Sequence, residues 1–220
     1  MAKIVELNKY RMKWNVKDIA FLYPPDVFTG AFDNEKMEMR HREEVEKKLA
    51  KLKGDLAAAD DPVAAMTLLH KKDHLQFLVN NVEFFREALQ LEETLIALYT
   101  RNNTPFSSEG DAELWNRLFA TCDRTRLRQC GSPLPFRAAT VYRGTVSGCR
   151  HSLIWTPDQE TVARIARKWQ APDIGGGEMF EVDVQAEQIL VYLQKRRGEE
   201  VILAPEFIAC APIRAYGRQS

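Results

Sequence analysis

The sequence predicts an α+β fold in which a mainly helical region, residues 1–123, precedes a region rich in strands, residues 124–220. Two observations support this prediction. In the first region, apolar residues recur every three or four positions between charged ones, as on amphipathic helices. After the turn-forming residues 130–135, apolar residues occur in short alternating or β-branched runs, which are typical of strands.

Three helical segments are expected in the first region. Residues 34–59 contain strong helix formers and no proline, with an apolar stripe at Val45, Leu49, Leu52 and Leu56. Asp61 and Pro62 begin the second segment, which is expected to reach about Tyr99 with an interruption near Asn80 and Asn81. Ser108 and Asp111 begin the third, which extends to Cys122. This region shows no recognisable chemistry, so we expect a scaffold, a lid or a partner-binding surface.

Strands and one further helix are expected in the second region. Thr156 is the predicted N-cap of that helix, with Pro157 in its first position and Gln159 completing a capping box. Its buried stripe is expected at Val162, Ala166 and Trp169, and a glycine-rich loop follows at residues 170–177. The expected strands lie at residues 140–142, 152–155, 179–184, 189–192 and 201–203.

Composition limits the class of protein. The chain has 220 residues, of which 45% are hydrophobic and 28% charged, as in ordinary globular proteins. No apolar run approaches the roughly 20 residues that cross a bilayer, and the N-terminus lacks a signal pattern, so a cytoplasmic protein without membrane contact is expected. The cysteines form no Cys-x-x-Cys pair and are expected to be reduced thiols. His70 and His74 share a helix face, but without a third ligand no metal site is predicted.

Two charged side chains stand out in the second region. Arg143 follows an apolar run and precedes Gly144, so the strand is expected to end there; its guanidinium could bind a phosphate, or it could be an ordinary hydrated strand-end arginine. Glu200 begins an apolar run, where a carboxylate loses hydration unless a ligand uses it. Glu199 is expected on the opposite face, and both carboxylates could instead be charges that protect an edge strand.

The segment between these two residues has its own pattern. Period-two alternation places Ser152, Ile154 and Thr156 on one face of a strand, and Leu153 and Trp155 on the other. Basic residues also outnumber acidic ones between residues 124 and 168. This excess suits an anionic ligand such as a dinucleotide or nucleic acid, or it hydrates helix faces.

Together these segments resemble the Arg-Ser-Glu class of the ADP-ribosyltransferase fold, over about residues 138–208. Tyr142, Arg143 and Gly144 resemble the first motif, residues 155–166 the middle block, residues 179–184 the strand that follows it, and residues 199–203 the last block. The resemblance implies a split β-sheet core and NAD as the substrate. The segments resemble those of bacterial and phage members of this fold. The resemblance does not extend to the first 120 residues.

The resemblance also implies roles for single residues. Arg143 would bind the diphosphate of NAD or the adjacent ribose, in a cofactor-binding set with Tyr142, Gly144 and Trp155. Glu200 would hydrogen-bond the nicotinamide ribose and stabilise the positive charge that develops on it. Ile154 occupies the position of the family serine, so Ser152 or Thr156 is expected to supply that hydroxyl.

The activity implied is mono-ADP-ribosylation of a macromolecule, either protein or nucleic acid. Such an enzyme would be an intracellular toxin or an effector in conflict between bacteria and phage, with an antitoxin or regulatory partner. Gly198 stands where arginine-modifying members have Glu or Gln, which argues against arginine as the acceptor. Two alternatives stay open: an inactive module of this fold that binds a nucleotide or a partner protein, and a helical interaction protein with an incidental α+β tail.

Overall fold

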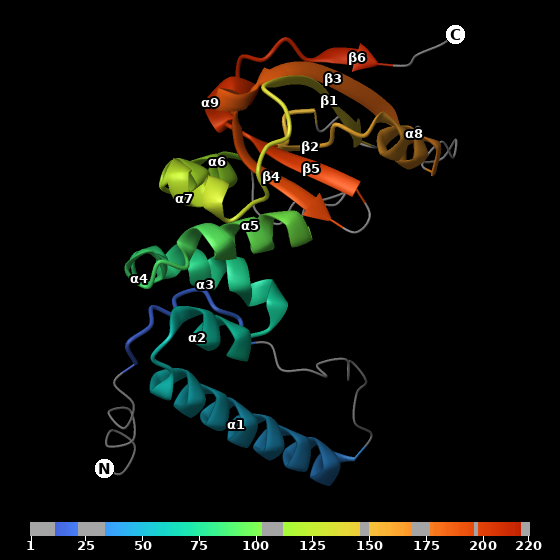
Figure 1. Ribbon diagram of the computed structural model, residues 1–220. Coiled ribbons are helices and arrows are strands. Elements are labelled where there is room, and N and C mark those ends of the chain that lie inside the picture. The colour runs from blue at the N-terminus through green and yellow to red at the C-terminus, as the bar shows by residue number, and fades with distance from the viewer. Residues whose placement is uncertain are drawn as a thin grey trace. The chain divides into compact units, whose positions relative to one another are not determined.

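The computed structural model describes residues 12–21, 34–102, 112–145, 150–168, 177–195 and 198–216 (Figure 1). The α+β prediction is confirmed, since helices between residues 35 and 129 precede two antiparallel three-stranded sheets. The chain divides into two compact units, Met1–Leu91 and Glu92–Ser220. The helices of residues 92–129 therefore belong with the sheets, whereas the functional division at residue 123 stays a prediction.

The first unit consists of short helices beside one long helix. The helix α1, Glu35–Ala58, begins at Asn34, whose side chain accepts a hydrogen bond from the amide of Lys36. Asp61 caps α2, Pro62–Leu68, by accepting from the amide of Ala64, as the Asp-Pro pair predicted. A 3₁₀ turn, Lys71–Asp73, then leads to α3, His74–Asn80, and α4, Val82–Glu87.

The predicted interruption at Asn80 and Asn81 is confirmed, and Asn81 gives its physical reason. The side chain of Asn81 accepts from the amide of Asn15 at 2.8 Å and donates to the carbonyl of Asn15 at 2.9 Å. It thus pairs with a neighbouring backbone segment at the break between α3 and α4. That segment also brings Trp14 into the core, where its ring lies 5.8 Å from that of Phe77.

The second unit begins with three helices: α5, Leu91–Asn102, which starts at the last residue of the first unit; α6, Ala112–Ala120; and α7, Arg124–Gln129. Tyr99 of α5 packs edge-on against Trp115 and Phe119 of α6, at 4.9 and 5.2 Å between ring centroids. The sequence pattern did not predict α7, which Asp123 caps through the amides of Thr125 and Arg126. The predicted caps Ser108 and Asp111 lie outside the described residues.

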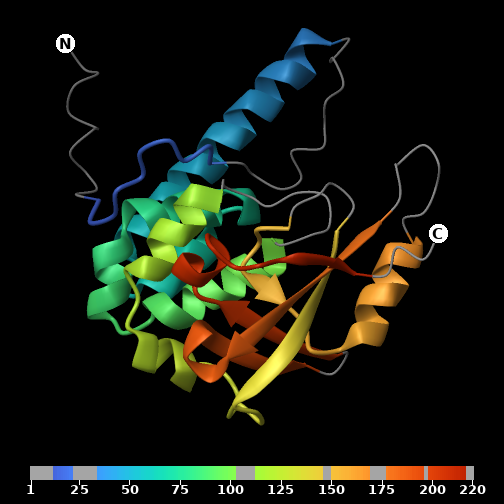
Figure 2. The ribbon, with the colours of Figure 1, turned by 90° about the horizontal axis from the view of Figure 1, so that it is seen from above.

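Two small antiparallel sheets follow (Figure 2). In the first, β3 (Glu178–Gln185) lies between β1 (Ala138–Thr145) and β6 (Arg214–Tyr216). In the second, β5 (Gly198–Leu203) lies between β2 (Ile154–Trp155) and β4 (Ile189–Lys195).

The two sheets meet at one backbone bridge. Tyr142 of β1 donates to the carbonyl of Thr156 at 2.7 Å, and the amide of Thr156 donates to the carbonyl of Tyr142 at 2.9 Å. The end of β2 is thus hydrogen-bonded to strands of both sheets. This junction places residues distant in sequence beside one another.

One helix packs against the first sheet. The helix α8, Gln159–Lys168, contacts β1 and β3 through a stripe that includes the buried residues Val162 and Ala166 (Figure 1). This part of the predicted stripe is confirmed, while Trp169 and residues 170–176 lie outside the described residues. The short helix α9, Pro205–Ile208, and strand β6 were not predicted, since each is too short to show a period.

No helix within the described residues combines the length and apolar character needed to cross a membrane.

Candidate active site

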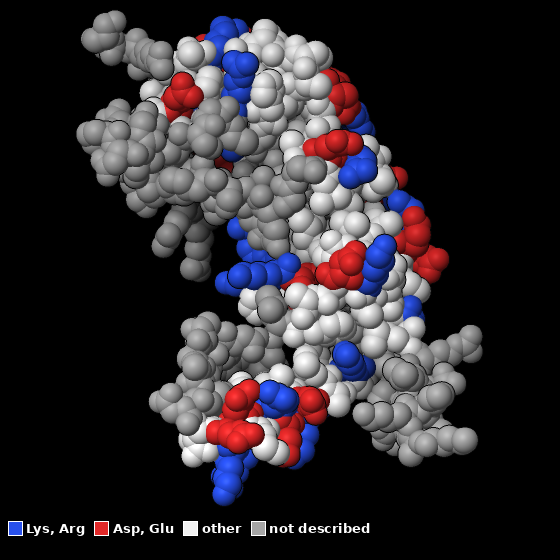
Figure 3. All heavy atoms as spheres, turned by 180° about the vertical axis from the view of Figure 1, so that it is seen from behind, with Lys and Arg blue, Asp and Glu red and all other residues white. Residues whose placement is uncertain are grey.

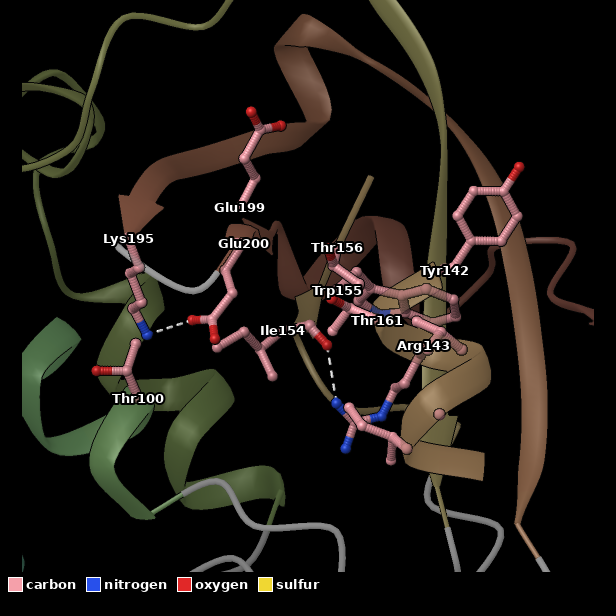
Figure 4. A pocket seen from close by; sticks show the side chains of 14 residues that line it. Thr100, Tyr142, Arg143, Ile154, Trp155, Thr156, Thr161, Lys195, Glu199 and Glu200 are labelled. Carbon is pink, nitrogen blue, oxygen red and sulfur yellow. Dashed lines mark hydrogen bonds and ion pairs between the residues drawn. The ribbon is translucent and has the colours of Figure 1, made fainter. Parts of the chain in front are cut away.

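A pocket of about 210 Å³ lies at the junction of the two sheets in the second unit (Figure 4). Its walls come from β1, β2, α8, β4 and β5, with one residue from α5. Six of the seven predicted site residues line it, namely Tyr142, Arg143, Gly144, Trp155, Thr156 and Glu200. The other lining residues are Thr100, Ile154, Thr161, Val162, Ile165, Lys195, Gly198 and Glu199.

Arg143 is the cation on the β1 wall. Arg143 is 7% exposed, and its Nη1 donates to the carbonyl of Ile154 at 2.8 Å (Figure 4). The expectation that the strand ends at this residue was wrong, because β1 continues to Thr145. Alternation along β1 therefore turns Arg143 inward with Val141 and Thr145, which excludes the alternative of a hydrated strand-end arginine.

Gly144 lies inside β1, under α8. A Cβ at this position would lie 3.2 Å from Cγ2 of Ile165 and 3.3 Å from the carbonyl oxygen of Val162. The missing side chain thus allows close packing of the helix on the strand. The sequence predicted a loop glycine in a ligand-binding set, whereas the structure gives Gly144 a packing role at the wall of the pocket.

Tyr142 contributes to the wall, but its ring points away from Arg143 (Figure 4). Its ring centroid lies 5.3 Å from that of Tyr216 on β6. Burial, and then the negative charge of Glu181, raise the pKa of the Tyr142 phenol. The backbone of Tyr142 bridges the sheets while its ring belongs to the outer face of the first sheet.

Glu200 and Glu199 come from β5, which is the central strand of its sheet. The hypothesis that these carboxylates protect an edge strand is therefore wrong. Their side chains point in different directions, as alternation predicted (Figure 4). Glu200 forms an ion pair with Lys195 of β4, while Glu199 accepts from the phenol of Tyr192, whose pKa is raised by burial first and then by this carboxylate.

Thr156 is buried at the end of β2 and is not the cap of α8. Its Oγ1 accepts from the amide of Asp158 at 3.0 Å, which forms a local turn. The cap is Asp158, whose Oδ1 accepts from the amides of Glu160 and Thr161 at 2.9 and 3.2 Å. The predicted helix start was thus two residues early, because the carbonyl of Thr156 accepts from the amide of Tyr142 and not from a helix amide, as the carbonyl of an N-cap residue does.

Asp158→Ala is expected to cost about 1 kcal/mol of folding free energy, the usual effect of removing a cap. Hydrogen bonds from the hydroxyl and the amide of Thr161 lower the pKa of the Asp158 carboxyl. Its contribution is therefore fully present above the carboxyl pKa of the unfolded chain and is lost as the pH falls through the lower folded-state value. Denaturant unfolding at several pH values tests this, with Asp158→Asn as a capping control that lacks this pH dependence. A cap at Thr156 instead would make Thr156→Ala the costlier change.

Ser152 is the one predicted site residue that the described lining of the pocket does not include. Its Oγ lies 3.0 Å from the hydroxyl of Tyr99, which also accepts from the amide of Leu153 at 2.9 Å. The predicted strand over residues 152–155 is shorter in the structure, because Nε1 of Trp155 donates to the carbonyl of Ser152 and closes a turn there. Ser152 therefore does not continue the face of Ile154 and Thr156.

Tyr99→Phe is expected to destabilise the second unit by about 1–3 kcal/mol, since it leaves the buried amide of Leu153 without its acceptor. Ser152→Ala is the matched control, because it removes a neighbour of the same hydroxyl and keeps the Leu153 bond. Calorimetric unfolding of the two variants should give the larger loss for Tyr99→Phe. Equal stability of Tyr99→Phe and the unmodified protein would show that the hydroxyl does not hold this segment.

Lys195, Thr100 and Thr161 line the pocket but were missed by the sequence interpretation. Lys195 lies three residues beyond the strand predicted at residues 189–192, so the predicted strand did not reach it. Thr100 comes from α5, in the region whose sequence contained no recognisable catalytic or binding motif. Thr161 Oγ1 donates to Oδ2 of Asp158 at 2.6 Å, so it links the helix cap to the pocket.

The basic excess between residues 124 and 168 is partly compensated within the second unit. Arg124 pairs with Glu206, and Arg126 pairs with the buried Glu92 at 3.0 Å. On the face drawn in Figure 3, basic and acidic side chains of the described residues are interspersed. The described residues of that face therefore form no broad basic surface.

No protein-family model, no curated protein and no solved structure matches this chain. The pocket itself therefore provides the evidence for function. It combines a buried guanidinium, a carboxylate, a buried hydroxyl and apolar side chains within one enclosure. Such a set can bind a molecule with both an anionic group and a sugar.

Proposed function

We propose that the second unit is a mono-ADP-ribosyltransferase that uses NAD to modify a protein or nucleic acid. The observation that supports this most is that Arg143 and Glu200, from different sheets, line one pocket. The split arrangement of two small sheets also agrees with the family that residues 138–208 resemble. An incidental α+β tail gives no reason for these two charged residues to converge.

The chemistry of the pocket fits NAD. The guanidinium of Arg143 offers a planar, permanent cation for the diphosphate or the adjacent ribose. Ile154, Val162 and Ile165 provide apolar surface for the nicotinamide ring. Thr156 lies on the same wall with a hydroxyl, and unlike Ser152 it reaches the pocket, so Thr156 is the residue we assign to the role of the family serine.

The reaction exchanges one bond at the nicotinamide ribose. The bond from its anomeric carbon to the nicotinamide nitrogen breaks, and its electron pair leaves with neutral nicotinamide. The positive charge that develops on the sugar is stabilised by the carboxylate of Glu200. A nucleophile of the acceptor then forms the new bond to that carbon and releases a proton. Glu200 also accepts a hydrogen bond from a ribose hydroxyl, which fixes the sugar.

The acceptor is not an arginine side chain on this proposal. Gly198 lines the pocket with φ of 138°, a conformation that residues with a Cβ rarely adopt. The Glu or Gln that arginine-modifying members have at this position would therefore strain β5. Other protein side chains and nucleobases remain as acceptors. The helical region 1–123 would recognise the acceptor, or an antitoxin or regulatory partner.

Transfer of label from NAD tests the proposal. The protein is incubated with NAD labelled in the adenylate phosphate and with a cell lysate, and the products are digested with protease or nuclease. Label that becomes attached to one class of macromolecule, with release of an equal amount of nicotinamide, is the expected result. NAD that stays intact and unbound in every mixture would overturn the proposal.

A second candidate is an inactive module that binds NAD or a related nucleotide. The specific observation in its favour is Ile154, which replaces the family serine, together with the ion pair that engages Glu200. This candidate predicts saturable NAD binding without nicotinamide release. An active enzyme would both bind NAD and release nicotinamide. Calorimetry and a nicotinamide assay on one sample therefore distinguish the two candidate functions.

Arg143→Ala is expected to weaken NAD binding by about tenfold or more, because a hydrogen bond to a charged group contributes roughly 1.5–3 kcal/mol. The NAD affinity of Arg143→Lys should lie between those of Arg143→Ala and the unmodified protein, since lysine keeps the charge without the bidentate fork. Calorimetric titration with NAD measures both, and circular dichroism checks folding because Arg143 also binds the Ile154 carbonyl. Full affinity in both variants would remove Arg143 from the site.

A further inference from the structure

We infer that Lys195 is a positioning residue for the Glu200 carboxylate. The expected effect on the reaction rate rests on the proposed function, whereas the expected effect of Lys195 on the position of the Glu200 side chain does not. Lys195 is paired with Gly198, and Leu193 with Glu200, across β4 and β5. Because faces alternate along each strand, Lys195 and Glu200 project to the same side of the sheet and lie diagonally opposite.

The ion pair occupies one side of the carboxylate. Nζ of Lys195 donates to Oε2 of Glu200, and both residues line the pocket (Figure 4). A carboxylate accepts several hydrogen bonds, so Oε1 can still accept from a ribose hydroxyl. The pair therefore limits the rotation of a flexible glutamate side chain while one oxygen remains for the substrate.

A purely stabilising role does not account for this pair. The side chains of Lys195 and Glu200 are 42% and 34% exposed, and ion pairs in such surroundings contribute little to folding stability. The melting temperature should therefore change little when Lys195 is replaced. What the pair affects is the direction of the carboxylate, and small displacements of a reacting group lower rates strongly.

The ammonium also has an opposing effect, because a positive charge near the sugar disfavours the charge that develops there. Positioning and charge therefore predict opposite changes when the ammonium is removed. If positioning is the larger effect, Lys195→Met lowers kcat; if charge is larger, kcat rises. The sign of the change thus distinguishes the two physical effects.

The test compares Lys195→Met and Lys195→Arg, with Arg167→Met on α8 as a control for the loss of one exposed positive charge outside the pocket lining. Nicotinamide release from NAD is expected to show kcat reduced roughly 10- to 100-fold in Lys195→Met, with little change in KM. Lys195→Arg should recover most of the rate, and Arg167→Met should match the unmodified protein. An unchanged or higher kcat in Lys195→Met would overturn the inference.

A second measurement separates this inference from the proposed function. Crystal structures of the two variants show directly where the Glu200 side chain lies. We expect the Glu200 carboxylate to point out of the pocket in Lys195→Met. In Lys195→Arg it should lie as in the unmodified protein. A carboxylate that keeps its place in Lys195→Met overturns the positioning role whether or not the protein uses NAD. Absence of nicotinamide release from the unmodified protein would instead contradict the proposed function.

Discussion

Glu200→Gln is expected to lower the rate of ADP-ribose transfer by about 10²–10³, with NAD affinity nearly unchanged. The amide is almost the same size as the carboxylate but lacks the negative charge that stabilises the developing positive charge on the sugar. Steady-state kinetics of nicotinamide release give kcat and KM separately. The loss should therefore appear in kcat.

Glu199→Gln is the matched control for this change. It removes the same charge from the neighbouring residue of β5, whose side chain points elsewhere and accepts from Tyr192. Its kcat should stay close to that of the unmodified protein. A full rate in Glu200→Gln with a strong loss in Glu199→Gln would assign the chemistry to the other carboxylate.

Trp155→Ala is expected to destabilise the second unit by about 3–5 kcal/mol, the usual cost of deleting a large buried aromatic side chain. Trp155 is 2% exposed, and its indole also donates to the carbonyl of Ser152 at 2.7 Å. Scanning calorimetry measures the loss.

Trp155→Phe should lose much less stability than Trp155→Ala, because it keeps most of the buried apolar surface and loses only the indole donor. The sequence placed Trp155 among the NAD-binding residues, whereas its burial indicates a structural contribution to the pocket. A folded Trp155→Ala variant with unchanged stability and reduced NAD affinity would restore the original prediction.

Periodicity predicted most of the larger elements. The stripe that includes Val162 and Ala166 and the alternating run of β3 reflect burial of one face, which sequence spacing records directly. Strand β4 was found as a continuous apolar run, and its residues 189–192 are all buried. The elements that were missed or misplaced are either too short to show a period or begin at a residue that two candidate caps compete for. Strand β2 has only two residues, and the choice between Thr156 and Asp158 as the cap depends on a backbone bridge to a strand distant in sequence.

The pocket was predicted less completely than the fold. Arg143 and Glu200 were found because each charge adjoins an apolar strand. Ser152 was misplaced because its hydroxyl interacts with Tyr99, which is 53 residues away in the sequence. Lys195 was missed because its significance comes from strand pairing across a hairpin, and single-sequence alternation does not show which residues of two strands face each other.

We expect Arg143 and Glu200 to bind opposite parts of one NAD molecule. A crystal structure with a carbocyclic NAD analogue, which cannot release nicotinamide, tests this expectation. The expected structure has the diphosphate or the adjacent ribose at the guanidinium of Arg143, and the nicotinamide ribose within about 2.6–3.2 Å of the Glu200 carboxylate. An analogue bound elsewhere on the chain, or bound in this pocket without contact to either residue, would contradict these roles of Arg143 and Glu200.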